Sequence, residues 1–433
     1  MNTLEVLRAG RLAGTKELRI SADLDQFPRE ILDLSETLEI LDLSGNRLHE
    51  LPDDFSRLRK LRIVFFSQNH FQEFPRVLAQ CPDLEMVGLK SCRIGSVQDD
   101  ALPANLRWLI LTDNQLERLP DSIGDHPRLQ KLMLAGNQLR ELPRTLSHCR
   151  NLELLRISAN QLEAFPDWLL DMPRLSWLAW SGNPFCARHE EHELPPQVDW
   201  EDLVLEQTLG QGASGVISRA QVRGTDRSVA VKVFKGSVTS DGYPQDEMAA
   251  CIAAGRHPNL VNVEGRIANH PEARLGLVLS LIPPQYRNLG GPPSFESCTR
   301  DVFAQGSTLP ASQILSIARG VASLMAHLHG RGVNHGDLYA HNILIDPAGH
   351  PLKGDFGAAS LLDGFTATRR ESLQRLEVRA YGCLLDDLLG LLHASEAKSP
   401  VLAPVRAMRD ACMTETVSAR PLFEDIAKGL GAD

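Results

Sequence analysis

A recurring asparagine most constrains how the first part of this 433-residue chain can fold. It returns every 22 or 23 residues, and a cysteine fills the one missing place. The positions are Asn46, Asn69, Cys92, Asn114, Asn137, Asn160 and Asn183. A unit this short cannot bury its own leucines, so neighbouring units must stack into one continuous core. The period therefore predicts a solenoid.

Each unit reads Leu-x-x-Leu-x-Leu-x-x-Asn-x-Leu-x-x-Leu-Pro, as in Leu38 to Pro52. This pattern resembles the leucine-rich repeat, with seven units over about 38–183 and a degenerate N-terminal cap over 12–30. We expect a leucine-rich-repeat domain over 1–183. Its asparagines should bond to backbone groups at the turns, where an unpaired buried group costs about 1–3 kcal/mol.

The strand of each unit should alternate, with leucines inward and the residues between them on the concave face. The first row of such residues is Ile40, Ile63, Met86, Trp108, Lys131, Leu154 and Trp177. The second row is Asp42, Phe65, Gly88, Ile110, Met133, Arg156 and Ala179. A contiguous exposed patch is predicted that binds a protein partner, or over which the second domain or the cap folds. It would consist of Ile63, Phe65, Met86, Trp108, Ile110 and Met133.

The second part of the chain carries a glycine pattern and a lysine strand. Strands over 203–209 and 216–222 would form a hairpin around the glycine pattern Gly210-Gln211-Gly212-Ala213-Ser214-Gly215, which Ile217 follows. Glycines there would let the backbone approach phosphate groups closely. The strand Val229-Ala230-Val231-Lys232 comes next. A predicted helix over 245–254 then carries Glu247, with Asp246 beside it as the alternative partner for the lysine.

A third group of residues offers proton and metal chemistry. The string His335-Gly336-Asp337-Leu338-Tyr339-Ala340-His341-Asn342 is followed by Asp355-Phe356-Gly357. It combines one aspartate that can accept a proton with an asparagine and a second aspartate that can hold a metal. Phosphoryl transfer needs such groups, because its catalysis is mostly positioning and neutralisation of negative charge. Helical periodicity over 311–329 predicts a helix before the string.

In this order, the motifs of the second part resemble those of a eukaryotic-type protein kinase domain. The resemblance implies a two-lobed α+β domain over 200–433, with an N-lobe at about 200–282 and a C-lobe at about 283–433. Residues 184–199 would be a linker after the α/β solenoid, and the stretch 283–306 a surface insertion. The implied cofactors are ATP and Mg²⁺, with Mn²⁺ as the alternative ion.

The resemblance also implies roles for single residues. Lys232 would hold the phosphates, Glu247 would orient Lys232, and Asp337 would be the catalytic base. Asn342 and Asp355 would hold the metal. The remaining ATP-binding residues would be Gly210, Gln211, Gly212, Ala213, Ser214, Gly215, Ile217 and Ala230.

Several positions depart from the family pattern. Gly336 stands where an arginine usually reads a phosphorylated activation loop. Tyr339 replaces the lysine of Ser/Thr kinases, and His341 takes the position of the cation of tyrosine kinases, where it could donate to the γ-phosphate. The segment from Asp355 to Glu377 is short and lacks an Ala-Pro-Glu motif, leaving Glu371 as the obvious carboxylate for Arg420. Glu377 would open the central buried helix, where the family usually has aspartate.

Three functions stay open at this stage. A Ser/Thr kinase with a protein-binding repeat domain is favoured, because every ion-handling residue is retained. A tyrosine or dual-specificity kinase is the second, and it rests on His341. An ATP-binding pseudokinase scaffold is the third.

The composition of the chain limits which classes of partner and which cellular compartment are expected. A net charge of −10 and a pI near 5.8 argue against binding to nucleic acid or anionic membranes. No stretch is apolar enough to span a membrane or serve as a signal peptide. Eight scattered cysteines are typical of a reducing, cytoplasmic setting. The 36 arginines against 9 lysines hint at a bacterial source. Cys186, His189 and His192 have metal-like spacing, but a solvated charge run is the favoured interpretation.

Overall fold

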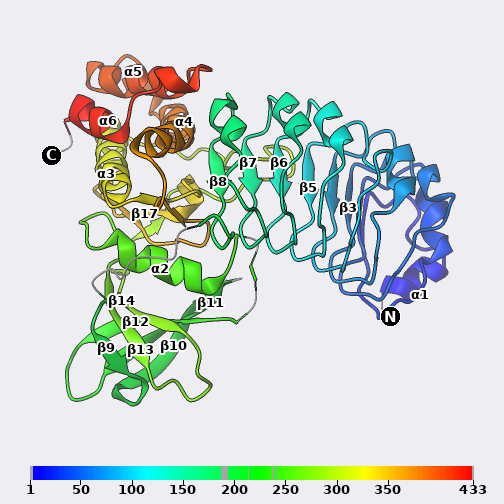
Figure 1. Cartoon of the computed structure of the whole chain (residues 1–433), viewed down its shortest axis with the longest axis horizontal. Coiled ribbons are helices and arrows are strands. Elements are labelled where there is room, and N and C mark those ends of the chain that lie inside the picture. Colours follow the sequence, from blue (N-terminus) through cyan, green and yellow to red (C-terminus); the bar gives the residue numbers. More distant parts are fainter. Residues whose placement is uncertain (1–2, 187–193, 213, 237, 240, 432–433) are drawn as a thin grey trace. The chain divides into compact units, whose positions relative to one another are not determined.

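The computed structural model describes residues 3–186, 194–212, 214–236, 238–239 and 241–431. The chain divides into two compact units (Figure 1). The first comprises Met1–Met172 and Asn183–Phe185, and the second comprises Pro173–Gly182 and Cys186–Asp433. Ten residues of the last predicted repeat thus belong to the second unit.

The first unit is a solenoid of short parallel strands, one per repeat, preceded by helix α1 (Thr3–Arg8). Its strands are β1 (Glu17–Arg19), β2 (Ile40–Asp42), β3 (Ile63–Phe65), β4 (Met86–Gly88), β5 (Trp108–Ile110), β6 (Lys131–Met133) and β7 (Leu154–Arg156). Each strand pairs in parallel with the next, and Figure 1 shows them as a row coloured from blue to green. The predicted solenoid is confirmed.

Short 3-10 helices form the opposite side of most repeats. They span Arg29–Leu34, Phe55–Arg57, Arg76–Gln80, Asp121–Asp125, Arg144–His148 and Asp167–Asp171. Proline precedes five of the six, at Pro28, Pro75, Pro120, Pro143 and Pro166. The fixed φ of proline and its missing N–H suit the start of a helix. The Leu-Pro end of the repeat pattern therefore starts the returning segment of each unit.

The repeating asparagines bond to the backbone of the turns, as predicted. Asn69 Nδ2 donates to the carbonyls of Leu43 and Phe66, both at 2.9 Å, and Asn69 Oδ1 accepts from Leu48 N at 2.9 Å. Cys92 acts in the same place, since its thiol donates to Phe66 O at 3.1 Å. The ladder thus pairs buried groups that stacking takes out of water.

The apolar patch predicted on the concave face is only partly exposed. The strand register does align the two predicted rows, with Ile63 opposite Met86 and Phe65 opposite Gly88. Ile63 and Met86, however, are each only 4% exposed. The Phe65 ring lies over Gly88 of the next strand, where an added side chain would start 2.6 Å from the ring. The expectation of a fully exposed patch was therefore wrong for these two residues.

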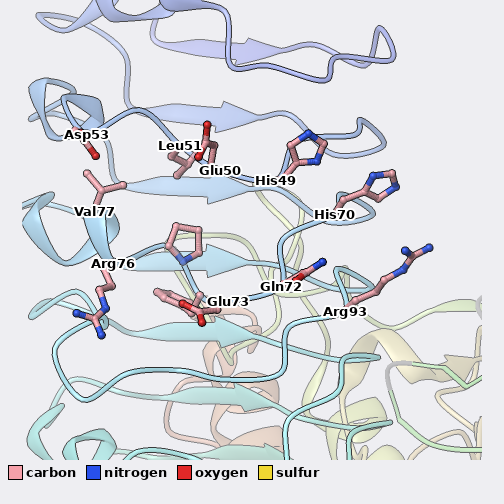
Figure 2. Close-up of a pocket in the computed structure, with 12 residues that line it drawn as sticks. His49, Glu50, Leu51, Asp53, His70, Gln72, Glu73, Arg76, Val77 and Arg93 are labelled. Carbon is pink, nitrogen blue, oxygen red and sulfur yellow. The ribbon is translucent and has the colours of Figure 1, made fainter.

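The first unit also carries a polar pocket (Figure 2). Its lining comes from successive repeats and includes His49, Glu50, Asp53, His70, Glu73 and Arg93. The rings of His49 and His70 are stacked with centroids 6.2 Å apart. This lining is largely polar, unlike the apolar lining typical of small-molecule sites.

After Pro173–Gly182, the second unit continues with a mixed sheet. Its strands are β9 (Gln197–Asp199), β10 (Leu203–Gln211), β11 (Gly215–Val222), β12 (Ser228–Phe234), β13 (Val263–Ala268) and β14 (Gly276–Ser280). The order is β10-β11-β12-β14-β13-β9, antiparallel except for the β13–β9 pair. Helix α2 (Pro244–Ala254) lies beside the sheet (Figure 1). The predicted hairpin, lysine strand and helix are all confirmed.

The rest of the second unit is mainly helical. Its helices are α3 (Ala311–Gly330), α4 (Ala367–Gly390), α5 (Ala403–Cys412) and α6 (Phe423–Leu430). Short strands complete it: β8 (Trp177–Ala179), β15 (Arg287–Asn288), β16 (Val333–Asn334), β17 (Ile343–Ile345), β18 (Pro351–Lys353) and β19 (Ser360–Leu361). The predicted helix 311–329 is confirmed as α3. Helix α4 begins ten residues before Glu377, because Thr366 caps it by accepting from Arg369 N. Starting that helix at Glu377 was wrong.

The state of the cysteines and the polarity of the helices relate to the predicted reducing compartment and to the predicted lack of a membrane span. All eight cysteines are free thiols, and all but Cys186 are buried. Within the described ranges, helices are either too short or too polar to cross a membrane. His189 and His192, considered above as metal ligands with Cys186, lie outside the described residues.

Candidate active site

A buried ion pair links the sheet to α2. Lys232 Nζ on β12 donates to Glu247 Oε1 on α2, and the two side chains are 10% and 2% exposed. Burial opposes the charge of Lys232, but the carboxylates of Glu247 and Asp355 outweigh it and raise its pKa. Burial also raises the pKa of Glu247. Of the two acidic neighbours on α2, Glu247 is therefore the partner of Lys232.

The glycine pattern forms the turn of the β10–β11 hairpin. Gly212 N donates to Gly215 O at 3.0 Å, and Lys235 Nζ donates to Gly212 O at 2.9 Å. A side chain at Gly215 would start 2.5 Å from Val233 O, so only glycine lets β11 lie this close to β12. Gln211 and Gly212 are exposed, and Ala213 lies outside the described residues.

Two more predicted nucleotide-binding residues lie on neighbouring strands. Ile217 on β11 stands directly opposite Lys232 on β12. Ala230, two residues before the lysine, is buried and stands opposite Leu279 on β14. The hairpin and the lysine strand therefore present one continuous surface. The backbone and small side chains of this surface can lie against a nucleotide.

The loop after β16 brings Asp337 and Asn342 together. Asn342 Nδ2 donates to Asp337 Oδ2 at 2.5 Å. This bond directs the amide nitrogen of Asn342 to the carboxylate, which leaves its amide oxygen as the ligating atom. Asp337 is half-buried, so its carboxylate stays within reach of an incoming hydroxyl.

A buried carboxylate on α4 holds the start of this loop. Glu377 Oε2 accepts from His335 N at 3.1 Å, and Glu377 Oε1 accepts from Gly336 N at 2.5 Å. His329 Nε2 of α3 lies 2.6 Å from Glu377 Oε2. Although glutamate is one methylene longer than the aspartate usual in the family, its carboxylate still binds the loop. The buried His335 ring also packs on the ring of Phe356, centroids 5.1 Å apart, which connects the loop to the Asp355 turn.

Asp355 and Asn342 are the residues that fit a divalent cation. Asp355 is exposed, and its Oδ1 accepts from Gly357 N at 3.1 Å, a bond that orients the carboxylate. A carboxylate and an amide oxygen suit Mg²⁺, which usually takes few protein ligands and completes its shell with water and phosphate oxygens. The described residues contain no cluster of three or more His, Cys, Asp or Glu at metal-binding distances. An ion that takes few protein ligands can share this carboxylate and this amide oxygen with the phosphate oxygens of a nucleotide.

His341 has a partner that the sequence did not indicate. Its Nδ1 lies 2.6 Å from Asp301 Oδ1, and Asp301 Oδ2 accepts from the backbone N–H groups of Ala340 and His341. Only Nε2 of His341 is left for a ligand. The Asp301 side chain is 1% exposed, so the stretch 283–306 is not merely a surface insertion. That expectation was wrong because part of the stretch braces the loop.

Lys353, two residues before Asp355, is a buried cation that sequence reasoning missed. It is 2% exposed, and its Nζ donates to Asp337 O at 3.1 Å. Burial lowers its pKa, although Asp337, Asp355, Glu377 and Asp301 all act in the opposite sense. A lysine at an inward position of a short apolar strand was the available signal. Lys353 can hold the backbone of Asp337 from below.

Arg420 does not meet Glu371, contrary to expectation. Glu371 pairs with Arg375 on α4, with 3.3 Å between Arg375 Nη1 and Glu371 Oε2. Arg420 is 1% exposed and donates instead to the carbonyls of Thr414, Arg375 and Pro173. Burial lowers the pKa of Arg420 to about 10. Carbonyl oxygens thus take the place of the expected carboxylate.

His257, which follows α2, gives the unit a predicted pH dependence. Its Nδ1 accepts from Asn259 N at 3.1 Å, a bond that requires the neutral ring. Burial, with His327 and His350 nearby, lowers its pKa from 6.5 to about 4. The unfolded chain therefore binds a proton first as pH falls. The free energy of unfolding should decrease between pH 6.5 and 4, by less than about 1.4 kcal/mol per pH unit because the ring is partly exposed.

Urea unfolding of the second unit at several pH values checks this. His257→Gln should flatten the decrease, because it removes the ring whose pKa burial lowers. Equal slopes for wild type and His257→Gln would contradict the assignment.

Comparison with known proteins agrees with this geometry. A protein kinase domain model matches residues 203–373. A leucine rich repeat model matches residues 36–94, 82–139, 104–162 and 127–185.

Two curated relatives are distant. Fibroblast growth factor receptor 1 of Xenopus laevis is 27% identical over 221 residues, covering 47% of this chain and 27% of the receptor. Serine/threonine-protein kinase PkaA of Streptomyces coelicolor is 27% identical over 281 residues, covering 52% of this chain and 49% of that kinase. The alignments span about half of the second protein and about a quarter of the first.

Proposed function

Because the chain carries leucine-rich repeats followed by a protein kinase domain, we propose that it transfers the γ-phosphoryl group of ATP to a serine or threonine hydroxyl of a protein. The observation that carries the proposal is the buried Lys232–Glu247 pair, formed in the same unit as the Asp337–Asn342 contact. In protein kinases this ion pair and the metal-binding aspartate must both be in place for catalysis. A formed pair favours a catalytic function over a scaffold.

In this proposal the N-lobe binds the nucleotide. Lys232 holds the α- and β-phosphates, and Glu247 keeps the ammonium group oriented toward them. The hairpin from Gly210 to Gly215, with Ile217 and Ala230, covers the nucleotide. The cationic form of Lys232 is favoured by its raised pKa, which suits phosphate binding.

The C-lobe residues act on the acceptor. Asp337 takes the proton of the acceptor hydroxyl. As it does so, the hydroxyl oxygen bonds to the γ-phosphorus, and the bond between the γ-phosphorus and the bridging oxygen of ADP breaks. Asn342 and Asp355 would hold Mg²⁺, or Mn²⁺, through oxygen atoms. The ion would neutralise charge on the phosphates. His341 Nε2 would donate to the γ-phosphate, with the ring fixed by Asp301.

The acceptor class rests on two observations of different weight. The streptomycete Ser/Thr kinase aligns over 49% of its own length, against 27% for the receptor, which supports serine or threonine. His341, four residues after Asp337, supports tyrosine or dual specificity. Tyr339 cannot supply the lysine of Ser/Thr kinases, and its ring is buried. We favour serine and threonine.

The repeats would select the protein partner. Half-buried apolar residues of the two concave rows, Phe65, Trp108, Ile110 and Met133, offer contact area for a protein. The net charge of −10 disfavours nucleic acid and anionic membranes as partners. Free, mostly buried thiols support a cytoplasmic setting.

Phospho-amino-acid analysis tests the function. The purified chain, incubated with Mg²⁺ and labelled ATP and with a mixed peptide library, should yield phosphoserine and phosphothreonine. Phosphotyrosine as the main product would support a tyrosine or dual-specificity kinase. Binding of ATP with no label on any protein would point to a pseudokinase scaffold.

Loop phosphorylation should not be needed for activity. Gly336 offers no arginine to receive a phosphate, so replacing Thr366, Thr368 and Ser372 together by alanine should change the transfer rate by less than about threefold. Thr366 caps α4, and its loss should cost about 0.5–2 kcal/mol of stability, which thermal unfolding can separate from activity. A collapse of the rate in a folded triple variant would show that another residue reads the phosphate.

A further inference from the structure

The ten residues Pro173–Gly182, here called the docking segment, belong by sequence to the last repeat but by contacts to the kinase unit. The segment contains β8 (Trp177–Ala179). Trp177 and Trp180 are each 1% exposed. Aromatic side chains as large as these are rarely buried completely, so the segment is part of the unit's core.

Trp177 contacts the two residues that directly follow Asp337. Its Nε1 donates to Leu338 O at 3.0 Å. Its ring is stacked on the ring of Tyr339, with centroids 4.4 Å apart and planes 7° from parallel. One side chain thus holds both the backbone and a side chain of the loop that carries the proposed base.

The rest of the docking segment is bound to the surroundings of the same loop. Trp180 N donates to Ser360 Oγ at 3.0 Å, just after the Asp355 turn. Arg379 Nε of α4 donates to Arg174 O at 3.3 Å, and Arg420 donates to Pro173 O. The segment is therefore held along its length by hydrogen bonds, most of them to its own backbone.

The departures from the kinase pattern coincide with these contacts. A side chain at Gly336, whose φ is +71°, would start 2.8 Å from Leu178 O and 2.5 Å from Ala358 O. The arginine usual at this position would not fit. Tyr339 forms the aromatic stack, and Arg420 binds Pro173 in place of a carboxylate. Only nine residues separate Gly357 from the start of α4, and the docking segment fills space beside them.

We propose that Trp177 is a positioning residue for phosphoryl transfer, through which the docking segment holds the catalytic loop in its working geometry. It acts on Asp337 through Leu338 and Tyr339, and the inference rests on the proposed kinase function. Asp337 remains half-buried and Asp355 exposed, so both carboxylates stay accessible while the segment is in place. A misplacement of about 1 Å at a reacting group can cost about 100-fold in rate.

The test uses the full chain with four single variants and one double variant. Trp177→Ala removes both the stack and the hydrogen bond, whereas Trp177→Phe keeps an aromatic ring and so guards against misfolding. Tyr339→Ala removes the other half of the stack. Trp200→Ala, at a tryptophan of the same unit that contacts His270 instead, is the matched control. The readouts are the single-turnover transfer rate, the dissociation constant for Mg-ATP and amide hydrogen exchange over residues 338–342.

Trp177→Ala should lower the transfer rate about 10- to 100-fold while ATP affinity changes little. The transfer rate of Trp177→Phe should lie between the rates of Trp177→Ala and wild type. The double variant Trp177→Ala/Tyr339→Ala should be no slower than the slower single variant, since the two side chains form one contact. Exchange over 338–342 should become faster in Trp177→Ala and stay unchanged in Trp200→Ala.

Two results would overturn the proposal. An unchanged rate and unchanged exchange in Trp177→Ala would show that the segment is only packed nearby. A rise in rate would show that the segment restrains the enzyme instead. If wild type itself transfers no phosphate, the proposed function fails. In that case unchanged hydrogen exchange would also overturn the positioning contact, and faster exchange would support it.

Discussion

Asp337→Asn is expected to lower phosphoryl transfer by about 10²- to 10⁴-fold, the contribution typical of general acid–base catalysis. Asparagine keeps the size of the side chain and can still contact Asn342, but it cannot accept the hydroxyl proton. ATP affinity should stay within about threefold of wild type, because Asp337 acts on the acceptor and not on the nucleotide. Single-turnover transfer and equilibrium ATP binding, measured on the same preparation, check both expectations.

Asp410→Asn is the matched control for this experiment. Asp410 lies on α5 and pairs with Arg409 at the surface, with 2.7 Å between Arg409 Nε and Asp410 Oδ1. Its replacement should leave transfer and binding unchanged. If Asp337→Asn transferred phosphate at the wild-type rate, the catalytic base would have to be another residue.

Glu377→Ala is expected to cost several kcal/mol of stability, because each buried donor left without a partner costs about 1–3 kcal/mol. The change leaves three buried donors, His335 N, Gly336 N and His329 Nε2, without their acceptor. Because the first two belong to the catalytic loop, transfer should fall even at temperatures where the variant is folded. Urea unfolding and the transfer rate below the unfolding transition measure the two effects separately.

A second carboxylate on the same helix serves as the control. Glu371 is exposed and forms an i,i+4 pair with Arg375. Glu371→Ala should therefore change stability by no more than about 0.5 kcal/mol. Similar losses in Glu371→Ala and Glu377→Ala would contradict the structural role of the buried carboxylate.

Local patterns predicted most of the fold. The asparagine period, the glycine hairpin, the lysine strand and α3 each follow from spacing within about twenty residues, which is the range over which periodicity and turn chemistry act. Even the exceptional Cys92 could be placed in the ladder, because its position in the period is unambiguous. The choice of Glu247 over Asp246 likewise followed from the family spacing and agrees with the observed ion pair.

Contacts between distant residues could not be predicted in this way. Trp177 and Leu338 are 161 residues apart, and no periodicity relates them. Because Trp177 fits the repeat pattern, that pattern predicts it on the concave face of the solenoid. Asp301 was missed for the same reason, since it lies about 40 residues before the loop it braces in a stretch rich in proline and glycine. The departures at Gly336 and Tyr339 were visible, but their cause was not.

The most direct test of the account measures whether the purified full-length chain transfers the γ-phosphoryl of Mg-ATP to protein hydroxyls, beside Lys232→Met prepared in the same way. We expect label on serine and threonine with wild type, none when the divalent ion is chelated, and almost none with a folded Lys232→Met variant. Wild type that binds ATP but transfers no label with Mg²⁺ or Mn²⁺, or equal labelling by Lys232→Met, would contradict the account.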